Sequence, residues 1–202
     1  MSLTISLATF KQSLTQSEQI AALAHGAATT FPAFAIEKIT VGSFLEAYKA
    51  WEEFLESSLA LYMMGEACLD GSLPARFSTP PTSDHAKNML RGPSRFFDYA
   101  NPDFVRSAAA LHFDTGAPFE PHLRAITQDL HDLRTIRNAS AHITSTTQAA
   151  LDALAQRILT TPPPNVSVYA LLTANHPSLP PNTVYSYYIA TLKTTAELIC
   201  RQ

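Results

Sequence analysis

Apolar side chains recur at three- and four-residue steps in three long stretches of this chain. The first begins at residue 43, the second follows Pro121, and the third covers residues 185–199. This spacing places the apolar side chains on one helix face, so each stretch predicts an amphipathic helix. The apolar positions are Phe44, Leu45, Tyr48, Trp51, Leu55, Leu59 and Tyr62, then Leu123, Ile126, Leu130 and Leu133, and finally Tyr185, Tyr188, Ile189, Leu192, Ala196 and Ile199.

Capping signals predict where helices start and stop. Residues 43–46 and 15–18 both match the capping box, in which Ser or Thr is followed three residues later by Glu. The box at 43–46 predicts a helix that ends at Asp70-Gly71. The box at 15–18 predicts a short helix that ends at Gly26. Residues 145–148 could start another helix, which would run to about Leu159.

Fourteen prolines are clustered between these helices. Proline in a helix interior costs about 3 kcal/mol. We therefore expect a loop over residues 72–83, helical fragments over 84–113 broken at Pro93 and Pro102, and a proline-rich loop over 160–181. Within that loop, residues 166–172 form either a short strand or a helical turn.

The pattern contains no internal repeat and no strand–helix–strand alternation. It predicts an all-α protein, a single-domain bundle of four to six helices. We expect an N-terminal extension with a short helix over residues 1–35, followed by the helical domain over 36–202.

Composition and charge narrow the classes of function. Charged residues make up 15% of the chain and the net charge is −3, which exclude a disordered tail and a basic histone-like binder. The charge is unevenly distributed. Residues 34–70 hold 2 basic and 7 acidic side chains, whereas residues 71–113 hold 5 basic and 3 acidic ones. A basic patch is therefore expected near Lys87, Arg91, Arg95 and Arg106.

Other features bear on the compartment. Cys68 and Cys200 are too few for a disulfide scaffold and fit a reducing environment. The first ten residues lack a secretion signal, and no apolar stretch reaches the ~20 residues that a membrane helix needs. We expect a cytoplasmic protein without a membrane contact. The histidines show no metal-ligand spacing, so we expect no metal and no cofactor. Asp129, His131 and Asp132 are expected to be solvated.

One segment combines helical placement with chemistry. Leu130, Arg134, Asn138 and His142 follow one another at four-residue intervals. Residues four apart share a helix face, so the face that carries the apolar Leu130 continues with an arginine, an asparagine and a histidine. An unpaired buried charge costs several kcal/mol. We therefore expect a helix whose first half packs in the core and whose second half lines a cleft.

The residue types in this segment suit a phosphate. Arg137 offers a planar, permanently charged fork, and His142 can exchange a proton near neutral pH. Asn138 could hold a hydroxyl or a phosphate oxygen, or orient the imidazole. Together these groups could cleave RNA without a metal ion, by activating the 2′-hydroxyl, stabilising charge at phosphorus and protonating the leaving oxygen. Arg134 is expected to be a peripheral phosphate contact or a solvated charge.

The segment Arg137-Asn138-Ala-Ser-Ala-His142 resembles the signature of the HEPN superfamily (higher eukaryote and prokaryote nucleotide-binding domain). The ribonucleases of that superfamily carry Arg, a polar residue, three further residues and His. Trp51-Glu-Glu-Phe-Leu-Glu56 is similar to the early helix of HEPN proteins of the RiboL-PSP type. The likeness extends loosely over residues 40–200.

The resemblance implies a helical bundle that forms a symmetric homodimer, with two motifs facing each other across one cleft. It also implies a metal-independent endoribonuclease that leaves a 2′,3′-cyclic phosphate. The second copy would supply a second histidine, because one per chain is few for two proton transfers. The implied role is that of a toxin, an antiphage-defence effector or an RNA-processing factor, with an antitoxin or another effector as a partner.

Other interpretations of the same residues stay open. Arg137 could pair with Glu52 or Glu56 on the earlier helix, either as a structural tie or as the support of a catalytic fork. His142 could interact with the dipole at the C-terminus of its helix. The chain would then be a non-catalytic module that binds a nucleotide, RNA or a partner protein, or a bundle in which the motif is coincidental. Trp51 is expected in the core or in a dimer interface.

Overall fold

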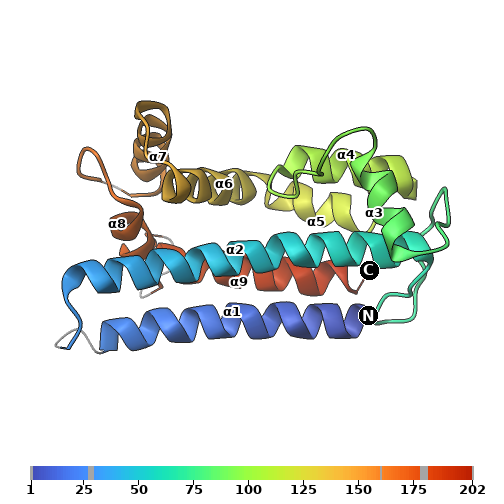
Figure 1. The fold of residues 1–202 in the computed structure, drawn as a ribbon, viewed down its shortest axis with the longest axis horizontal. Helices are drawn as coiled ribbons and strands as arrows, with labels where there is room; N and C mark the ends of the chain where they lie inside the picture. Colours follow the sequence, from blue (N-terminus) through green and yellow to red (C-terminus); the bar gives the residue numbers. More distant parts are fainter. Residues whose placement is uncertain (1, 27–29, 160, 178–181, 202) are drawn as a thin grey trace. The chain divides into compact units, whose positions relative to one another are not determined.

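The computed structural model describes residues 2–26, 30–159, 161–177 and 182–201. Over these ranges the chain forms nine α-helices and no β-strand, only two isolated bridges (Figure 1). The predicted all-α class is confirmed, whereas the predicted number of four to six helices is too low. The helices are α1 (Leu3–Gly26), α2 (Ala33–Met64), α3 (Ser83–Arg91), α4 (Pro102–His112), α5 (Phe119–Ala125), α6 (Thr127–Ala141), α7 (Ser145–Ile158), α8 (Val168–Thr173) and α9 (Val184–Ile199), with a short 3₁₀ turn, η1 (Asp114–Gly116).

The chain divides into two compact units, each assembled from segments far apart in the sequence. Unit 1 holds residues 1–11, 50–130 and 192–202, and unit 2 holds residues 12–49 and 131–191. Helices α1, α2 and α9 are each divided, with one part in unit 1 and the other part in unit 2. The expected single domain over 36–202, with residues 1–35 as an extension, stays a prediction.

Aromatic side chains form the centre of unit 1. Phe10 on α1 and Trp51 and Phe54 on α2 are at most 2% exposed, and their ring centroids lie between 5.1 and 5.8 Å apart. Rings of this size bury a large apolar area each, so they dominate the packing energy. Of the two expected places for Trp51, the structure shows the core.

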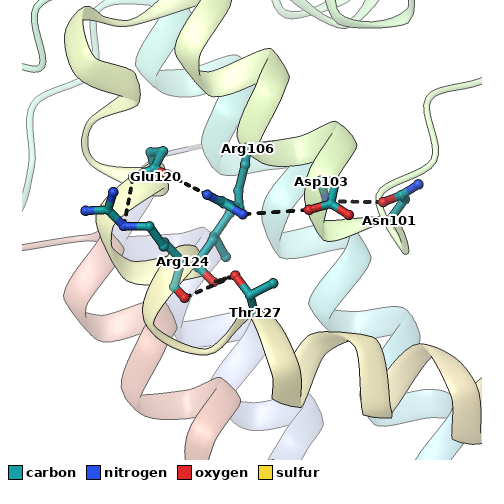
Figure 2. A network of polar contacts seen from close by, with 7 residues as sticks. Asn101, Asp103, Arg106, Glu120, Arg124 and Thr127 are labelled. Atoms are coloured by element: carbon teal, nitrogen blue, oxygen red, sulfur yellow. Dashed lines mark hydrogen bonds and ion pairs between the residues drawn. The ribbon is translucent and has the colours of Figure 1, made fainter.

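Figure 2 shows the polar contacts that fasten α5 to α4 within this unit. The Arg106 guanidinium on α4 lies 2.8 Å from the Glu120 carboxylate on α5 and 3.7 Å from Asp103. Arg124 also faces Glu120, at 3.7 Å. Arg106 therefore neutralises carboxylates between two helices instead of adding to an open basic patch.

The predicted helix after Pro121 is in fact two helices. The chain leaves the helical path at Ile126, between α5 and α6. The Thr127 hydroxyl donates to the carbonyl oxygens of Leu123 and Arg124, at 3.0 and 3.1 Å, and so satisfies groups at the end of α5 (Figure 2). A side chain that bonds to the backbone in this way competes with the continuing helix.

The predicted starts of the first two helices are wrong. α1 begins at Leu3, so the capping box at residues 15–18 lies inside it. α2 begins at Ala33, ten residues before the capping box at 43–46. In α1 the helix starts early because a buried apolar stripe precedes the capping box in the sequence. The stripe is formed by Leu3, Leu7, Phe10 and Leu14.

The end of α2 also differs from its prediction. The helix stops at Met64 and not at Asp70-Gly71. Gly65 follows with a φ of +98°, a left-handed conformation that favours glycine and commonly ends helices. A Cβ atom at Gly65 would lie 2.6 Å from the Arg76 guanidinium, so the space there is also taken.

The later boundaries agree with the sequence pattern. α3 and α4 flank the break at Pro93, and Pro102 is the first residue of α4, where its missing N–H costs nothing. Residues 166–172 contain a helical turn, α8, and no strand. The helix expected over 145–159 is α7, and the final helix is α9. Of the loop over 160–181, residues 160 and 178–181 lie outside the described residues.

Both cysteines are free, buried thiols in unit 1. The Cys200 carbonyl oxygen accepts a hydrogen bond from the Leu69 N–H at 2.8 Å. On the preceding residue, the Ile199 carbonyl accepts one from the Tyr62 hydroxyl, also at 2.8 Å. Burial, together with the neighbouring Cys68, raises the pKa of Cys200 to about 12. The thiol is therefore held in its neutral form at ordinary pH.

We expect Cys200 to resist alkylation in the folded protein. The thiolate is the nucleophile, and a pKa of about 12 leaves roughly one thiol in 10,000 ionised at pH 8. Because the folded pKa lies above the unfolded value of about 8.5, the stability that this thiol contributes is lost as the pH rises toward 12. Mass spectrometry after iodoacetamide treatment, with and without denaturant, measures the difference. Equal labelling rates in both conditions would contradict the buried thiol.

Candidate active site

The motif helix α6 buries one face and exposes the other. Leu133, Ile136 and Ala139 are almost fully buried, at three-residue steps. Arg137 and Asn138 lie on the exposed side, and Arg134 is half-buried. The predicted division into a core half and a polar half is wrong, because the buried face continues through the second half of α6 to Ala139 and the polar groups lie on the opposite side. That these groups line a cleft stays a prediction.

Asp132 anchors α6 within unit 2, and its expected solvation is wrong. Its side chain is only 4% exposed, accepts a hydrogen bond from the Tyr188 hydroxyl at 3.0 Å and pairs with Arg157. Tyr188 belongs to α9 and Arg157 to α7, so one carboxylate ties three helices together. Asp132 precedes Ile136 by four residues, which puts both side chains on the buried face. That spacing is the signal in the sequence that could have identified it.

Arg137 and Asn138 lie together on the exposed face of α6. An Nη1–H of Arg137 donates to Asn138 Oδ1 at 3.3 Å. This contact orients the guanidinium through its own neighbour and leaves most of its five donors directed to solvent. That Asn138 holds an oxygen of the RNA or orients the His142 imidazole stays a prediction.

His142 is the first residue after α6, where the chain turns sharply into α7 (Figure 1). Its backbone N–H donates to the Asn138 carbonyl at 3.0 Å, and its carbonyl accepts from the Thr147 hydroxyl at 2.7 Å. Thr144 and Thr147 cap the start of α7 reciprocally. The backbone of His142 is thus fixed at both ends while its side chain is exposed.

The two glutamates expected to support Arg137 belong to the other unit. Glu52 and Glu56 lie on the part of α2 that contributes to unit 1, whereas Arg137 lies in unit 2. Both glutamates are half-buried, and Glu56 has a cationic partner in its own unit, Lys87, at 3.3 Å. The pairing of Arg137 with either carboxylate stays a prediction.

A basic pocket of about 540 Å³ lies in unit 1 and contains three of the four cations of the expected patch, Lys87, Arg91 and Arg95. Arg106 is not among its lining residues. Arg91 is held by Asn88, whose Oδ1 accepts its N–H at 2.7 Å. The pocket combines these cations with aromatic rings and with two carboxylates. Its other lining residues are Glu56, Asp84, Phe96, Phe97 and Tyr99.

Of the three aromatic rings in the basic pocket, that of Phe96 is open to solvent, and those of Phe97 and Tyr99 are half-buried. Phe96 is 73% exposed, and the rings of Phe97 and Tyr99 lie 4.7 Å apart. An exposed ring beside arginines offers a face on which a flat group of a ligand can stack. The sequence indicated the charges of this pocket but not the rings that accompany them.

Comparisons of the chain with models of protein families, with curated proteins and with solved structures found no match. The HEPN assignment therefore rests on the residues that carry the resemblance.

No group of three or more His, Cys, Asp and Glu side chains in the described ranges is arranged to hold a metal ion. In the same part of the chain, no helix combines the length and the apolar character that crossing a membrane requires.

Proposed function

We propose that this chain is a metal-independent endoribonuclease of the HEPN type, active as a homodimer. The observation that supports this most is the exposure of Arg137, Asn138 and His142 together at the end of α6. An arginine that ties helices together contacts a carboxylate, as Arg157 does with Asp132. Here the Arg137 guanidinium contacts Asn138 on the exposed surface of the helix.

The proposed reaction needs no group outside the protein and the RNA. A base removes the proton of the ribose 2′-hydroxyl, and this oxygen attacks the adjacent phosphorus. The bond from phosphorus to the 5′-oxygen breaks, and an acid gives that oxygen a proton. The products are a 2′,3′-cyclic phosphate and a 5′-hydroxyl. Arg137 stabilises the charge that develops on the phosphate oxygens, and His142 transfers a proton.

The proposal includes a second copy of the chain. In an in-line displacement the attacking 2′-oxygen and the leaving 5′-oxygen lie on opposite sides of phosphorus, so a single His142 would have to reach both sides to act as base and as acid. Two copies related by a two-fold axis would present two His142 side chains to one RNA strand. In this proposal the cleft lies between the copies, Arg134 contacts a neighbouring phosphate, and Glu52 or Glu56 supports Arg137.

The proposed biological role follows from the resemblance. The protein would act in the cytoplasm as a toxin or antiphage-defence effector, and an antitoxin or another effector would restrain or direct it.

Incubation of the purified protein with total RNA, with and without EDTA, tests the proposed activity. We expect cleavage in both samples, because the proposed proton transfers and charge stabilisation come from side chains. Intact RNA in both samples would contradict the proposal, and so would cleavage that EDTA abolishes.

The basic pocket of unit 1 favours a second candidate function, a module that binds RNA or a nucleotide without cleaving it. Single-stranded RNA is bound by cations that follow its backbone and by aromatic rings on which its bases stack. Arg91 and Arg95 supply the cations, and the exposed Phe96 supplies a ring. The acidic net charge limits this contact to a few phosphates.

We expect the double substitution Arg91→Glu and Arg95→Glu to weaken the binding of a short single-stranded RNA by about tenfold or more. Each lost phosphate contact should also reduce the steepness of the plot of log K against log salt concentration by about one. Fluorescence anisotropy at several salt concentrations measures both effects. The double variant Lys38→Glu and Arg201→Glu, which makes the same change of net charge at two exposed sites outside the pocket, is the matched control. Equal affinities for the double variant and the control would exclude this pocket as an RNA site.

A further inference from the structure

A cavity of about 390 Å³ lies in unit 2, apart from both sites described above. Its walls come from α1, α2, α8 and α9 and from the residue that precedes α9. Pockets for small molecules have volumes of roughly 300–1,000 Å³, mostly apolar walls and a few placed polar groups. Here Ala21 and Leu172 supply apolar wall, and hydroxyl, imidazole and carboxylate groups supply the polar positions.

The hydroxyl of Tyr185 is the unusual group in this cavity. Tyr185 is only 6% exposed, and its hydroxyl is buried without a hydrogen-bond partner among the described residues. Leaving a buried hydroxyl unpaired costs about 1–3 kcal/mol. Buried polar groups are almost always paired, so an unpaired hydroxyl on a residue that lines a cavity marks a position where a ligand or a water molecule can pair.

The surroundings of Tyr185 keep its hydroxyl protonated. Burial raises the pKa of Tyr185, and the Glu18 carboxylate raises it further. The neighbouring Ser17 side chain lowers the pKa of Tyr185 in part. It does not form a hydrogen bond with the Tyr185 hydroxyl. A neutral phenol both donates and accepts hydrogen bonds, and its oxygen can accept an N–H.

The charge in the cavity wall is acidic. Glu18 provides a carboxylate, and no Lys or Arg is among the lining residues. His25, seven residues later on α1, is fixed in place. One of its ring nitrogens lies 3.1 Å from the Thr40 hydroxyl, and its ring stacks on Tyr169 at 5.9 Å with an interplanar angle of 5°. Further hydroxyl oxygens in the wall offer more acceptors for N–H groups.

We propose that this cavity binds a small organic amine. The ammonium group lies against the Glu18 carboxylate and donates a hydrogen bond to the Tyr185 oxygen. The apolar part of the molecule packs against Ala21 and Leu172. This site is independent of the proposed ribonuclease activity, because it uses none of the same residues.

Binding of matched probes that differ only in their head group tests this proposal. The probes are 2-phenylethylamine, 2-phenylethanol and phenylacetate, and a second set carries the same head groups on a butyl chain. Saturation-transfer NMR detects binding, and the Tyr185 ring and Thr40 methyl signals show whether a probe enters this cavity. We expect the amines to bind at least tenfold more tightly than the alcohols, and the carboxylates not to bind.

Variants of the lining residues make this test specific. Glu18→Gln should remove the preference for amines over alcohols, and Tyr185→Phe should weaken amine binding severalfold. Glu37→Gln, an exposed glutamate on α2 outside the cavity, should leave the preference intact. The proposal fails if no probe binds at millimolar concentration, if alcohols bind as well as amines, or if the preference survives in the Glu18 variant.

Discussion

Replacing Arg137 or His142 by alanine is expected to abolish RNA cleavage while the protein stays folded and dimeric. Removing one donor that stabilises developing charge typically costs 10²–10³ in rate, and removing a proton-transfer group costs about 10²–10⁴. Both side chains are exposed, so their loss should change the free energy of unfolding by no more than about 0.5 kcal/mol. Gel-based cleavage rates, thermal unfolding and size-exclusion chromatography measure the three properties.

Two exposed residues outside the motif are matched controls. Arg201→Ala and His85→Ala make the same changes of side chain elsewhere on the surface. We expect both controls to cleave RNA at the rate of the unmodified protein. Undiminished cleavage by both motif variants would contradict the assigned roles. Equal losses in a motif variant and its control would also contradict them.

The substitution Asp132→Ala is expected to lower the free energy of unfolding by about 2–3 kcal/mol. It removes the carboxylate that accepts a hydrogen bond from the Tyr188 hydroxyl in a fully buried position. It also removes the partner of Arg157, whose side chain is 46% exposed and can turn to solvent at lower cost. Urea denaturation measures the loss. Cleavage should fall less than in the Arg137 variant, because Asp132 positions α6 and does not touch the RNA.

A double-mutant cycle separates the hydrogen bond from other effects of the substitution. The double variant Asp132→Ala and Tyr188→Phe lacks both the carboxylate and the hydroxyl of this hydrogen bond. Its loss of unfolding free energy should therefore be smaller than the sum of the losses in the two single variants. Strict additivity, or an unchanged stability of the Asp132 variant, would show that this carboxylate does not tie the helices together.

The sequence was most informative where apolar spacing and proline agreed. The final helix and the helix after Thr144 were predicted almost to their ends. The capping box at residues 15–18 misled because capping is a local signal worth about 1 kcal/mol. The buried stripe that begins at Leu3 contributes more than that, and it carries the helix through the box.

The candidate sites differ in how much of each could be predicted. Arg137, Asn138 and His142 lie within six residues, so the sequence alone places them at the same end of α6. Asp132 was missed because its partners, Tyr188 and Arg157, come from other helices. The cavity in unit 2 could not be predicted, since its walls combine residues from both ends of the chain and depend on tertiary packing.

Cleavage of one RNA with and without its 2′-hydroxyl groups tests the central claim most directly. The substrate is a single-stranded RNA that the protein cuts at a mapped position, and its twin carries a 2′-deoxynucleotide on the 5′ side of that position. The proposed mechanism predicts cleavage of the RNA in EDTA to a 2′,3′-cyclic phosphate, an intact twin, and no cleavage of either by Arg137→Ala or His142→Ala. Cleavage of the twin at the same position, or no cleavage of any RNA by the unmodified protein, would contradict it.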